Sequence, residues 1–267
     1  MKRFSFVFLF LMFSSLIYAI TPITPVVLVD NSECMMKVVA YEEDSWSFTL
    51  KAQCENKSKD KTYTFSITDS TVNGLMEYSS GYAEVPPKKR ANVNISFYGL
   101  KKDGISKASD ILLFFRVYDT NDWLADPVAM GQSHVYPYGE QNKDKYIRFG
   151  SNNDKILLSK VDVKLTLYES KADKDLELKV FLENKTGKEV MFSIDDASVN
   201  GYVVDPYWAK SVLPNSMAYS SINWSQRMLE ENLIFSVDDI EFTIRVSDYE
   251  DWLAPLIAEE NVILNFN

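Results

Sequence analysis

Two short loops carry the carboxylates that are best spaced for chemistry. Each has an Asp-x-x-Asp pattern followed at once by a tryptophan. Carboxylate oxygens are ligands for a hard cation such as calcium, and a loop of this kind can supply two or three of them. Aspartates also cap turns by accepting hydrogen bonds from their own backbone. We favour this second interpretation, with the tryptophan then plugging one end of the fold. The four aspartates are Asp119, Asp122, Asp248 and Asp251, and the tryptophans are Trp123 and Trp252.

Other patterns for catalysis are weak. The single histidine, His134, falls on a predicted strand, and nothing in the sequence places a nucleophile beside it. We find no glycine-rich phosphate loop, no histidine or cysteine cluster for zinc and no basic patch interleaved with aromatic residues. A hydrolase built on loop carboxylates would need a separation between them that a sequence does not supply. We therefore expect no enzyme activity, no catalytic residue and no cofactor.

One aromatic segment is a candidate binding loop. It contains Tyr202, Asp205, Tyr207 and Trp208, and it follows a predicted strand. Exposed tyrosine and tryptophan side chains on a loop are typical of surfaces that bind protein or glycan. In the alternative interpretation this loop folds back over the edge of the core.

Cys34 and Cys54 are the only cysteines. A hairpin that turns at residues 43–45 would pair residues whose numbers sum to 88 and would place the two cysteines opposite each other. An oxidising compartment would then permit a disulfide. The alternative is two buried free thiols that act as small apolar groups.

The elements that must position these residues come from an internal repeat. Residues 66–74 match residues 193–201 at a constant offset of 127 and end in Asn-Gly in both places. Three further matches keep the same order, and the offset changes by only one or two residues at turns. They pair residues 55–58 with 183–186, 116–119 with 245–248, and 122–124 with 251–253.

Each copy alternates apolar and polar residues with the period of a half-buried strand. Leu176, Leu178, Val180 and Leu182 show this pattern, as do alternate residues of the stretch 46–54. Residues 225–232 are an exception and predict a short capped helical turn. Short strands separated by turn signals indicate an all-β chain of two tandem immunoglobulin-like antiparallel sandwiches. We predict the first sandwich over residues 20–138, a linker over 139–154 that is partly extended near Tyr146, and the second sandwich over 155–267.

The chain begins like a secretory leader. Lys2 and Arg3 precede an apolar run from Phe4 to Phe13, and Ala19 offers a small residue for cleavage, so residues 1–19 are predicted to be a signal peptide. The alternative, an uncleaved anchor, would barely reach the ~20 residues that span a bilayer. Removal of the leader leaves 26 basic and 38 acidic residues, a net charge near −12. Such an acidic chain is a poor partner for nucleic acid or anionic lipid. We expect a secreted protein that is not an integral membrane protein once processed.

The repeated pattern runs Glu-Asn-Lys-Ser/Thr, then Ile-x-Asp-x-Ser/Thr-Val-Asn-Gly, then Arg-Val-x-Asp-x-x-Asp-Trp. It resembles uncharacterised domains of secreted and surface proteins from Gram-positive gut bacteria, which are similar to small secreted immunogenic proteins of actinobacteria. This resemblance covers the mature chain twice. It implies immunoglobulin-like sandwiches and an extracellular location, and it implies no particular activity.

The leading functional hypothesis is a non-enzymatic extracellular binding or adhesion module whose loops contact a protein or a glycan. A pair of structural or accessory domains, acting as a spacer or assembly partner through exposed strand edges, is the second hypothesis. A carboxylate-based hydrolase is the third.

Overall fold

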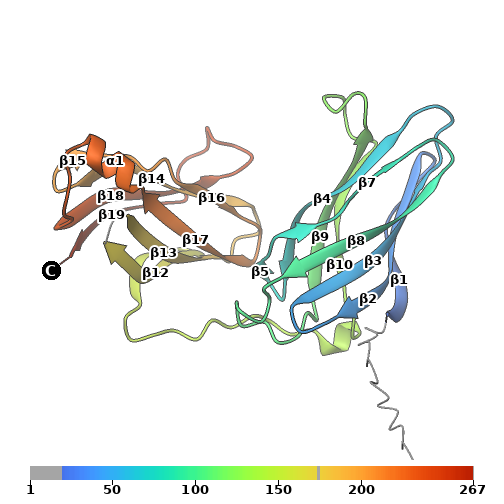
Figure 1. The fold of residues 1–267 in the computed structure, drawn as a ribbon, viewed down its shortest axis with the longest axis horizontal. Coiled ribbons are helices and arrows are strands. Elements are labelled where there is room, and N and C mark those ends of the chain that lie inside the picture. Colours follow the sequence, from blue (N-terminus) through green and yellow to red (C-terminus); the bar gives the residue numbers. More distant parts are fainter. Residues whose placement is uncertain (1–19, 173–174, 267) are drawn as a thin grey trace, which may run out of the picture.

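The chain is built almost entirely of antiparallel strands. The computed structural model describes residues 20–172 and 175–266, so the predicted leader lies outside the described residues. Figure 1 shows an elongated molecule with its N-terminal half at one end and its C-terminal half at the other. In the described part, no helix is long and apolar enough to cross a membrane.

The N-terminal half contains ten strands arranged in two sheets. In the first sheet the strand order is β1-β2-β3-β8-β6. In the second, β10 and β9 lie beside β4, which also pairs with the short strands β5 and β7. The strands are β1 (Thr21–Asp30), β2 (Cys34–Glu43), β3 (Ser47–Asn56), β4 (Tyr63–Val72), β5 (Leu75–Met76), β6 (Ser79–Ser80), β7 (Tyr82–Val85), β8 (Arg90–Tyr98), β9 (Ile111–Asp119) and β10 (Ala129–Val135).

The C-terminal half repeats this strand order. One sheet runs β11-β12-β13-β17, and in the other β19 and β18 lie beside β14, which also pairs with β15 and β16. Its strands are β11 (Lys155–Lys160), β12 (Val163–Ala172), β13 (Leu176–Asn184), β14 (Val190–Val199), β15 (Tyr202–Val203), β16 (Ala209–Val212), β17 (Ser216–Trp224), β18 (Asp239–Asp248) and β19 (Ala258–Asn265). The helical turn predicted near residue 225 is confirmed as α1 (Gln226–Glu231), with the Ser225 hydroxyl accepting from the N–H of Met228.

Each half has its own cluster of buried side chains, to which both of its sheets contribute. The predicted alternation is confirmed in β13, where Leu176, Leu178, Val180 and Leu182 are all buried. Phe48, Leu50, Ala52 and Cys54 likewise face the N-terminal cluster. Trp46 does not continue this pattern, because it lies in the turn before β3 and is exposed.

One asparagine in each half explains why a short motif recurs. The buried side chain of Asn184 donates to the carbonyls of Lys188, Val212 and Leu213, and Asn56 donates to those of Lys61 and Val85. Each therefore ties the turn after its own strand to a second turn nearby. Because a buried amide without partners costs roughly 1–3 kcal/mol, these positions demand asparagine.

The register predicted for the cysteines is wrong. The turn before β3 is longer than predicted, since the Asp44 carboxylate accepts from the backbone of both Trp46 and Ser47, and a bulge near Ala40 shifts the pairing again. Cys34 therefore faces Asn56, and Cys54 faces Met36. The cysteines form a diagonal pair, which is normally too far apart for a disulfide.

Both cysteines are buried free thiols in the structure. Burial raises the pKa of Cys34 to about 11 and that of Cys54 to about 12. The thiols therefore stay protonated at neutral pH and behave as apolar groups.

The stretch predicted as a linker connects the halves through specific contacts. It contains a 3₁₀ turn, η1 (Glu140–Asn142), and no strand near Tyr146. The Tyr146 hydroxyl lies 2.6 Å from that of Tyr219. Arg148 makes two hydrogen bonds to Asp154 and lies over the rings of Tyr168 and Phe181. Phe181 belongs to β13 but packs in the N-terminal cluster.

Candidate functional site

The strongest candidate site is present twice, on equivalent loops. Residues 120–128 connect β9 to β10, and residues 249–257 connect β18 to β19. We call these the Trp–Leu loops, because each presents a tryptophan followed by a leucine. Each loop begins directly after an aspartate that ends a strand, Asp119 or Asp248.

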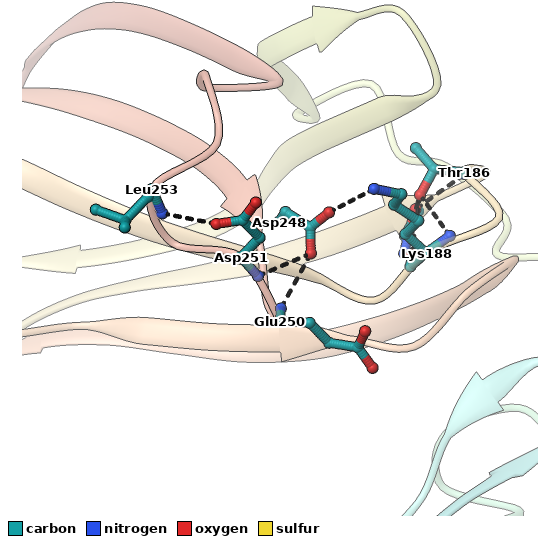
Figure 2. Close-up of polar contacts among 7 residues, drawn as sticks. Thr186, Lys188, Asp248, Glu250, Asp251 and Leu253 are labelled. Carbon is teal, nitrogen blue, oxygen red and sulfur yellow. Dashed lines mark hydrogen bonds and ion pairs between the residues drawn. The ribbon is translucent and has the colours of Figure 1, made fainter.

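Asp248 fixes the shape of the second Trp–Leu loop (Figure 2). Its Oδ1 accepts from the backbone N–H groups of Glu250 at 3.0 Å and Asp251 at 3.3 Å. Its Oδ2 lies 2.7 Å from Nζ of Lys188. The Lys188 ammonium and the N–H of Glu250 hold the pKa of Asp248 below its usual value. Asp251 continues the turn by accepting from the N–H of Leu253 at 3.2 Å.

Asp119 has the same role in the first Trp–Leu loop. Its Oδ1 accepts from the N–H of Asn121 at 3.0 Å, and Nζ of Lys61 lies 3.3 Å from its Oδ2. The hydrogen bond from Asn121 and the charge of Lys61 lower the pKa of Asp119. Arg116 donates to the carbonyl of Trp123 at 3.3 Å, which ties the loop to its own strand.

These hydrogen bonds match the turn-capping interpretation for three of the four loop aspartates, while Asp122 takes part in its turn through its backbone, donating to Asp119 and accepting from Ala125. Oxygens of Asp119, Asp248 and Asp251 already accept from backbone N–H groups. Within residues 20–172 and 175–266, His, Cys, Asp and Glu side chains form no group of three or more that could hold a metal ion.

The tryptophans do not plug the ends of the halves, so that prediction is wrong. Trp123 and Leu124 are 63% and 77% exposed, and Trp252 and Leu253 are 80% and 75% exposed. The aspartate turn reverses the chain immediately after the strand, so the two residues that follow it lie in a tight surface turn. The sequence held one signal for this exposure: two adjacent large apolar residues in a tight turn cannot both point inward.

The structure separates the residues of the predicted aromatic binding loop. Tyr202 and Tyr207 are exposed. The half-buried Asp205 accepts from the N–H of Tyr207, which has a φ of 53°. Trp208 is only 9% exposed and packs in the C-terminal cluster, where its indole donates to the Ser220 hydroxyl. The ring of Trp208 is therefore not part of an exposed surface, and this part of the loop folds over the core.

His134 lies in a cleft of about 570 Å³ that residues of both halves line. Its Nδ1 is 2.6 Å from Oδ1 of Asp110, and its ring stacks on Tyr136. In the part of the chain that the structure describes, no Ser, Thr or Cys side chain is hydrogen-bonded to His134. The geometry thus pairs the histidine with a carboxylate and an aromatic ring, without a nucleophile.

Comparison with known proteins names no family. No family model matches the chain, and no curated protein matches it. Among solved structures, a transglutaminase from red sea bream is similar at 9% identity and a TM-score of 0.24, covering 82% of this chain and 29% of that protein. A conserved domain protein from Bacillus anthracis is similar at 10% identity and a TM-score of 0.33, covering 93% of this chain and 92% of that one. TM-scores this low do not identify a shared fold.

Proposed function

We propose that the protein is a secreted, non-enzymatic binding module made of two immunoglobulin-like sandwiches, and that its Trp–Leu loops contact a protein ligand. The strand order supports the sandwich type. Immunoglobulin domains place strands A, B and E in one sheet and C, F and G in the other. In the C-terminal half, β12, β13 and β17 occupy the A, B and E positions, and β14, β18 and β19 occupy C, F and G. In the N-terminal half, β2, β3, β8 and β4, β9, β10 are arranged alike.

One observation carries the binding proposal: the same apolar pair is exposed on the same loop in both halves. Single exposed apolar residues are common on protein surfaces, whereas adjacent ones that form a contiguous patch mark interaction sites. The loops also hold these side chains on fixed turns, since Asp119 and Asp248 each bind the loop backbone. Preorganised side chains lose little conformational entropy when a ligand binds.

A protein ligand fits the loops better than a glycan does. A tryptophan ring can stack on a sugar, but the adjacent leucine offers only aliphatic surface. Buried aromatic and aliphatic anchors are what protein interfaces use to gain most of their binding energy. The leader-like first residues and the acidic net charge support an extracellular setting for this interaction.

The test is binding of the fluorescently labelled mature chain, from residue 20 onward, to cells of the producing organism. We expect saturable binding that protease treatment of the cells removes and periodate treatment spares. The double variant Trp123→Ser/Trp252→Ser should lose this binding. A matched control is Trp46→Ser, because Trp46 is also exposed but lies outside both loops.

Three results would count against the proposal. Binding that survives the double variant would remove the loops from the site. Binding that periodate abolishes would identify a glycan ligand instead. Binding that does not saturate would favour the spacer hypothesis.

A further inference from the structure

The far end of the C-terminal half carries an apolar surface made of Tyr202, Val203, Leu233 and Phe235. We call it the end patch. All four side chains are exposed, Val203 and Phe235 by 82% and 80%. The patch lies beside β15 and α1, at the end of the molecule that points away from the N-terminal half (Figure 1). Asn200 holds its two segments together, since its side chain bonds to the backbone of Ser236, Asp238 and Asp239.

The equivalent end of the N-terminal half is covered. There, Tyr146 donates its N–H to the carbonyl of Asn73 at 2.8 Å, and Met217 donates to that of Gly74 at 2.9 Å. Leu75 pairs with Met217 in a parallel bridge and is fully buried. Met76 packs against the C-terminal cluster. The C-terminal half and the connecting segment thus close this end.

Matching hydrogen bonds establish which positions of the two ends are equivalent. Asn73 bonds to the backbone of Lys107, Ser109 and Asp110 in the same way as Asn200 does to residues 236, 238 and 239. The N–H of Ile105 donates to Leu100, as that of Ile234 does to Leu229. Tyr202 and Val203 therefore correspond to Leu75 and Met76, and Leu233 corresponds to Gly104. The end patch is therefore the equivalent of the surface that is covered in the N-terminal half, but its side chains are exposed to solvent.

The charges at this surface differ between the two ends. By the same equivalence, Glu230, Glu231 and Asp238 at the open end replace Lys101, Lys102 and Ser109 at the covered end. Glu231 is paired with Arg227, and Asn232 replaces Asp103. The open end is thus more acidic than the covered end.

The charge difference is reversed at the other end of each half, where the C-terminal half is neutral and the N-terminal half is basic. In the C-terminal half, the residue that contacts the covered end is Met217. The two residues before it, Asn215 and Ser216, line the cleft next to this contact. Their equivalents in the N-terminal half are Lys88, Lys89 and Arg90, because Arg90 pairs with Glu55 as Met217 pairs with Glu183. Asn215 and Lys88 also share a positive φ, of 53° and 60°. Lys88 and Lys89 at one free end are therefore opposite in charge to Asp238 at the other, and the equivalents of these residues, Asn215, Ser216 and Ser109, lie at or next to the junction between the halves.

We propose that the end patch binds a second copy of this chain, at the turn between β7 and β8 of its N-terminal half. Such a contact would repeat the junction between the halves, with the contact at Met217 replaced by charge pairing. The two surfaces that meet are different, so the contact is heterologous and each added copy leaves both ends free. The protein would then assemble head to tail into chains.

The test is the solution mass of the mature chain, measured by sedimentation at concentrations up to about 0.5 mM, where a micromolar contact is saturated. We expect the mean mass to rise with concentration and to fall back in about 1 M salt, which screens the charges. Val203→Lys/Phe235→Lys and Lys88→Glu/Lys89→Glu should each be monomeric. An equimolar mixture of these two variants should stop at a two-chain complex, because each supplies one intact surface.

A control is Ile263→Lys, which alters an exposed residue of β19 and should leave the assembly unchanged. Circular dichroism of each variant checks that it is folded. Wild-type protein that stays monomeric at every concentration would overturn the proposal. So would assembly that persists in either double variant, or a mixture of the two that remains monomeric.

Discussion

The two halves share a strand order but differ at the residues that meet other surfaces. Where the halves agree, as at Asn56 and Asn184, the shared residue holds a turn by satisfying buried backbone groups. Where they differ, as at Gln53 and Phe181, one half contributes to the junction and the other faces solvent. The comparison teaches that residues shared by the two halves build the fold, while residues that differ between the halves determine what each half contacts.

The largest expected effect is at the junction. Phe181 is buried among aromatic rings between the halves, and the equivalent position in β3, facing Asn92 as Phe181 faces Tyr219, is the exposed Gln53. Phe181→Ala should lower the free energy of unfolding by about 4 kcal/mol, through lost burial and an empty cavity. Gln53→Ala should change it by less than about 0.5 kcal/mol. Urea unfolding of both variants measures this, and equal effects would contradict the equivalence.

A second comparison concerns the Asn-Gly turns. The buried side chain of Asn73 bonds to Lys107, Ser109 and Asp110, whereas Asn200 makes similar bonds at a less buried site. Asn73→Ala should cost about 3 kcal/mol, because several buried backbone groups lose their partner. Asn200→Ala should cost about 1 kcal/mol, since water replaces part of what is lost. Thermal unfolding of the two variants measures both losses of stability. A larger loss for Asn200→Ala than for Asn73→Ala would contradict the prediction.

Glu77 provides a comparison that depends on pH. Burial, with a smaller contribution from Asp103, raises the pKa of Glu77 to about 8. The contribution of the protonated carboxyl to the free energy of unfolding is fully present below the usual glutamate pKa. It is lost as the pH rises towards 8. The equivalent residue of the C-terminal half is the buried Val204, which donates to Ala197 as Glu77 donates to Ser70.

Glu77→Val should therefore stabilise the protein by about 2 kcal/mol above pH 8, allowing for partial exposure of the carboxylate. It should also flatten the dependence of unfolding free energy on pH between about 5 and 8. Glu241→Gln, at an exposed site on β18, is the control and should leave the pH profile as in the wild type. An unchanged profile for Glu77→Val would show that this carboxylate is solvated.

The smallest effects are expected at the Trp–Leu loops. Trp123→Ser and Trp252→Ser should each change the free energy of unfolding by less than about 0.5 kcal/mol, because both rings are exposed. Trp208→Ala serves as the contrasting variant and should cost about 3 kcal/mol, since its ring packs in the core. Differential scanning calorimetry can rank the three, and a large loss for either loop variant would mean that its ring is packed.

Local patterns predicted the all-β class, the strands and the capped helix. The alternation from Leu176 to Leu182 and the Ser225 cap depend on neighbours in the chain, so they are legible without the fold. The bulge near Ala40 was not predictable, because it depends on how β2 packs against β1 as well as β3. Pairs near the turn, such as Glu43 with Phe48, sum to 91 instead of the predicted 88, and beyond the bulge the sum is 90. The longer turn therefore displaced Cys34 from Cys54, and the bulge reversed only part of that displacement.

The candidate site was predicted only in part. The aspartates of the Trp–Leu loops were recognised as turn caps from their spacing, but the direction of the tryptophans was not. Whether a loop aromatic packs inward depends on the space that the rest of the fold leaves beneath it, which local sequence does not report. The sequence likewise left open whether Trp208 lies at the surface or folds over the core, and the structure places it in the core. The end patch was recognisable only by comparing two three-dimensional ends of the molecule.

The most direct test of the binding proposal uses all five tryptophans at once. Hydroxyl-radical oxidation of the mature chain, read by mass spectrometry, would be compared with and without cells that bind it. Free protein should be oxidised at Trp46, Trp123 and Trp252 and spared at Trp208 and Trp224, following their exposure. We predict that binding protects Trp123 and Trp252 while Trp46 stays reactive. Protection of Trp46 alone, or of no tryptophan, would contradict a binding surface on the Trp–Leu loops.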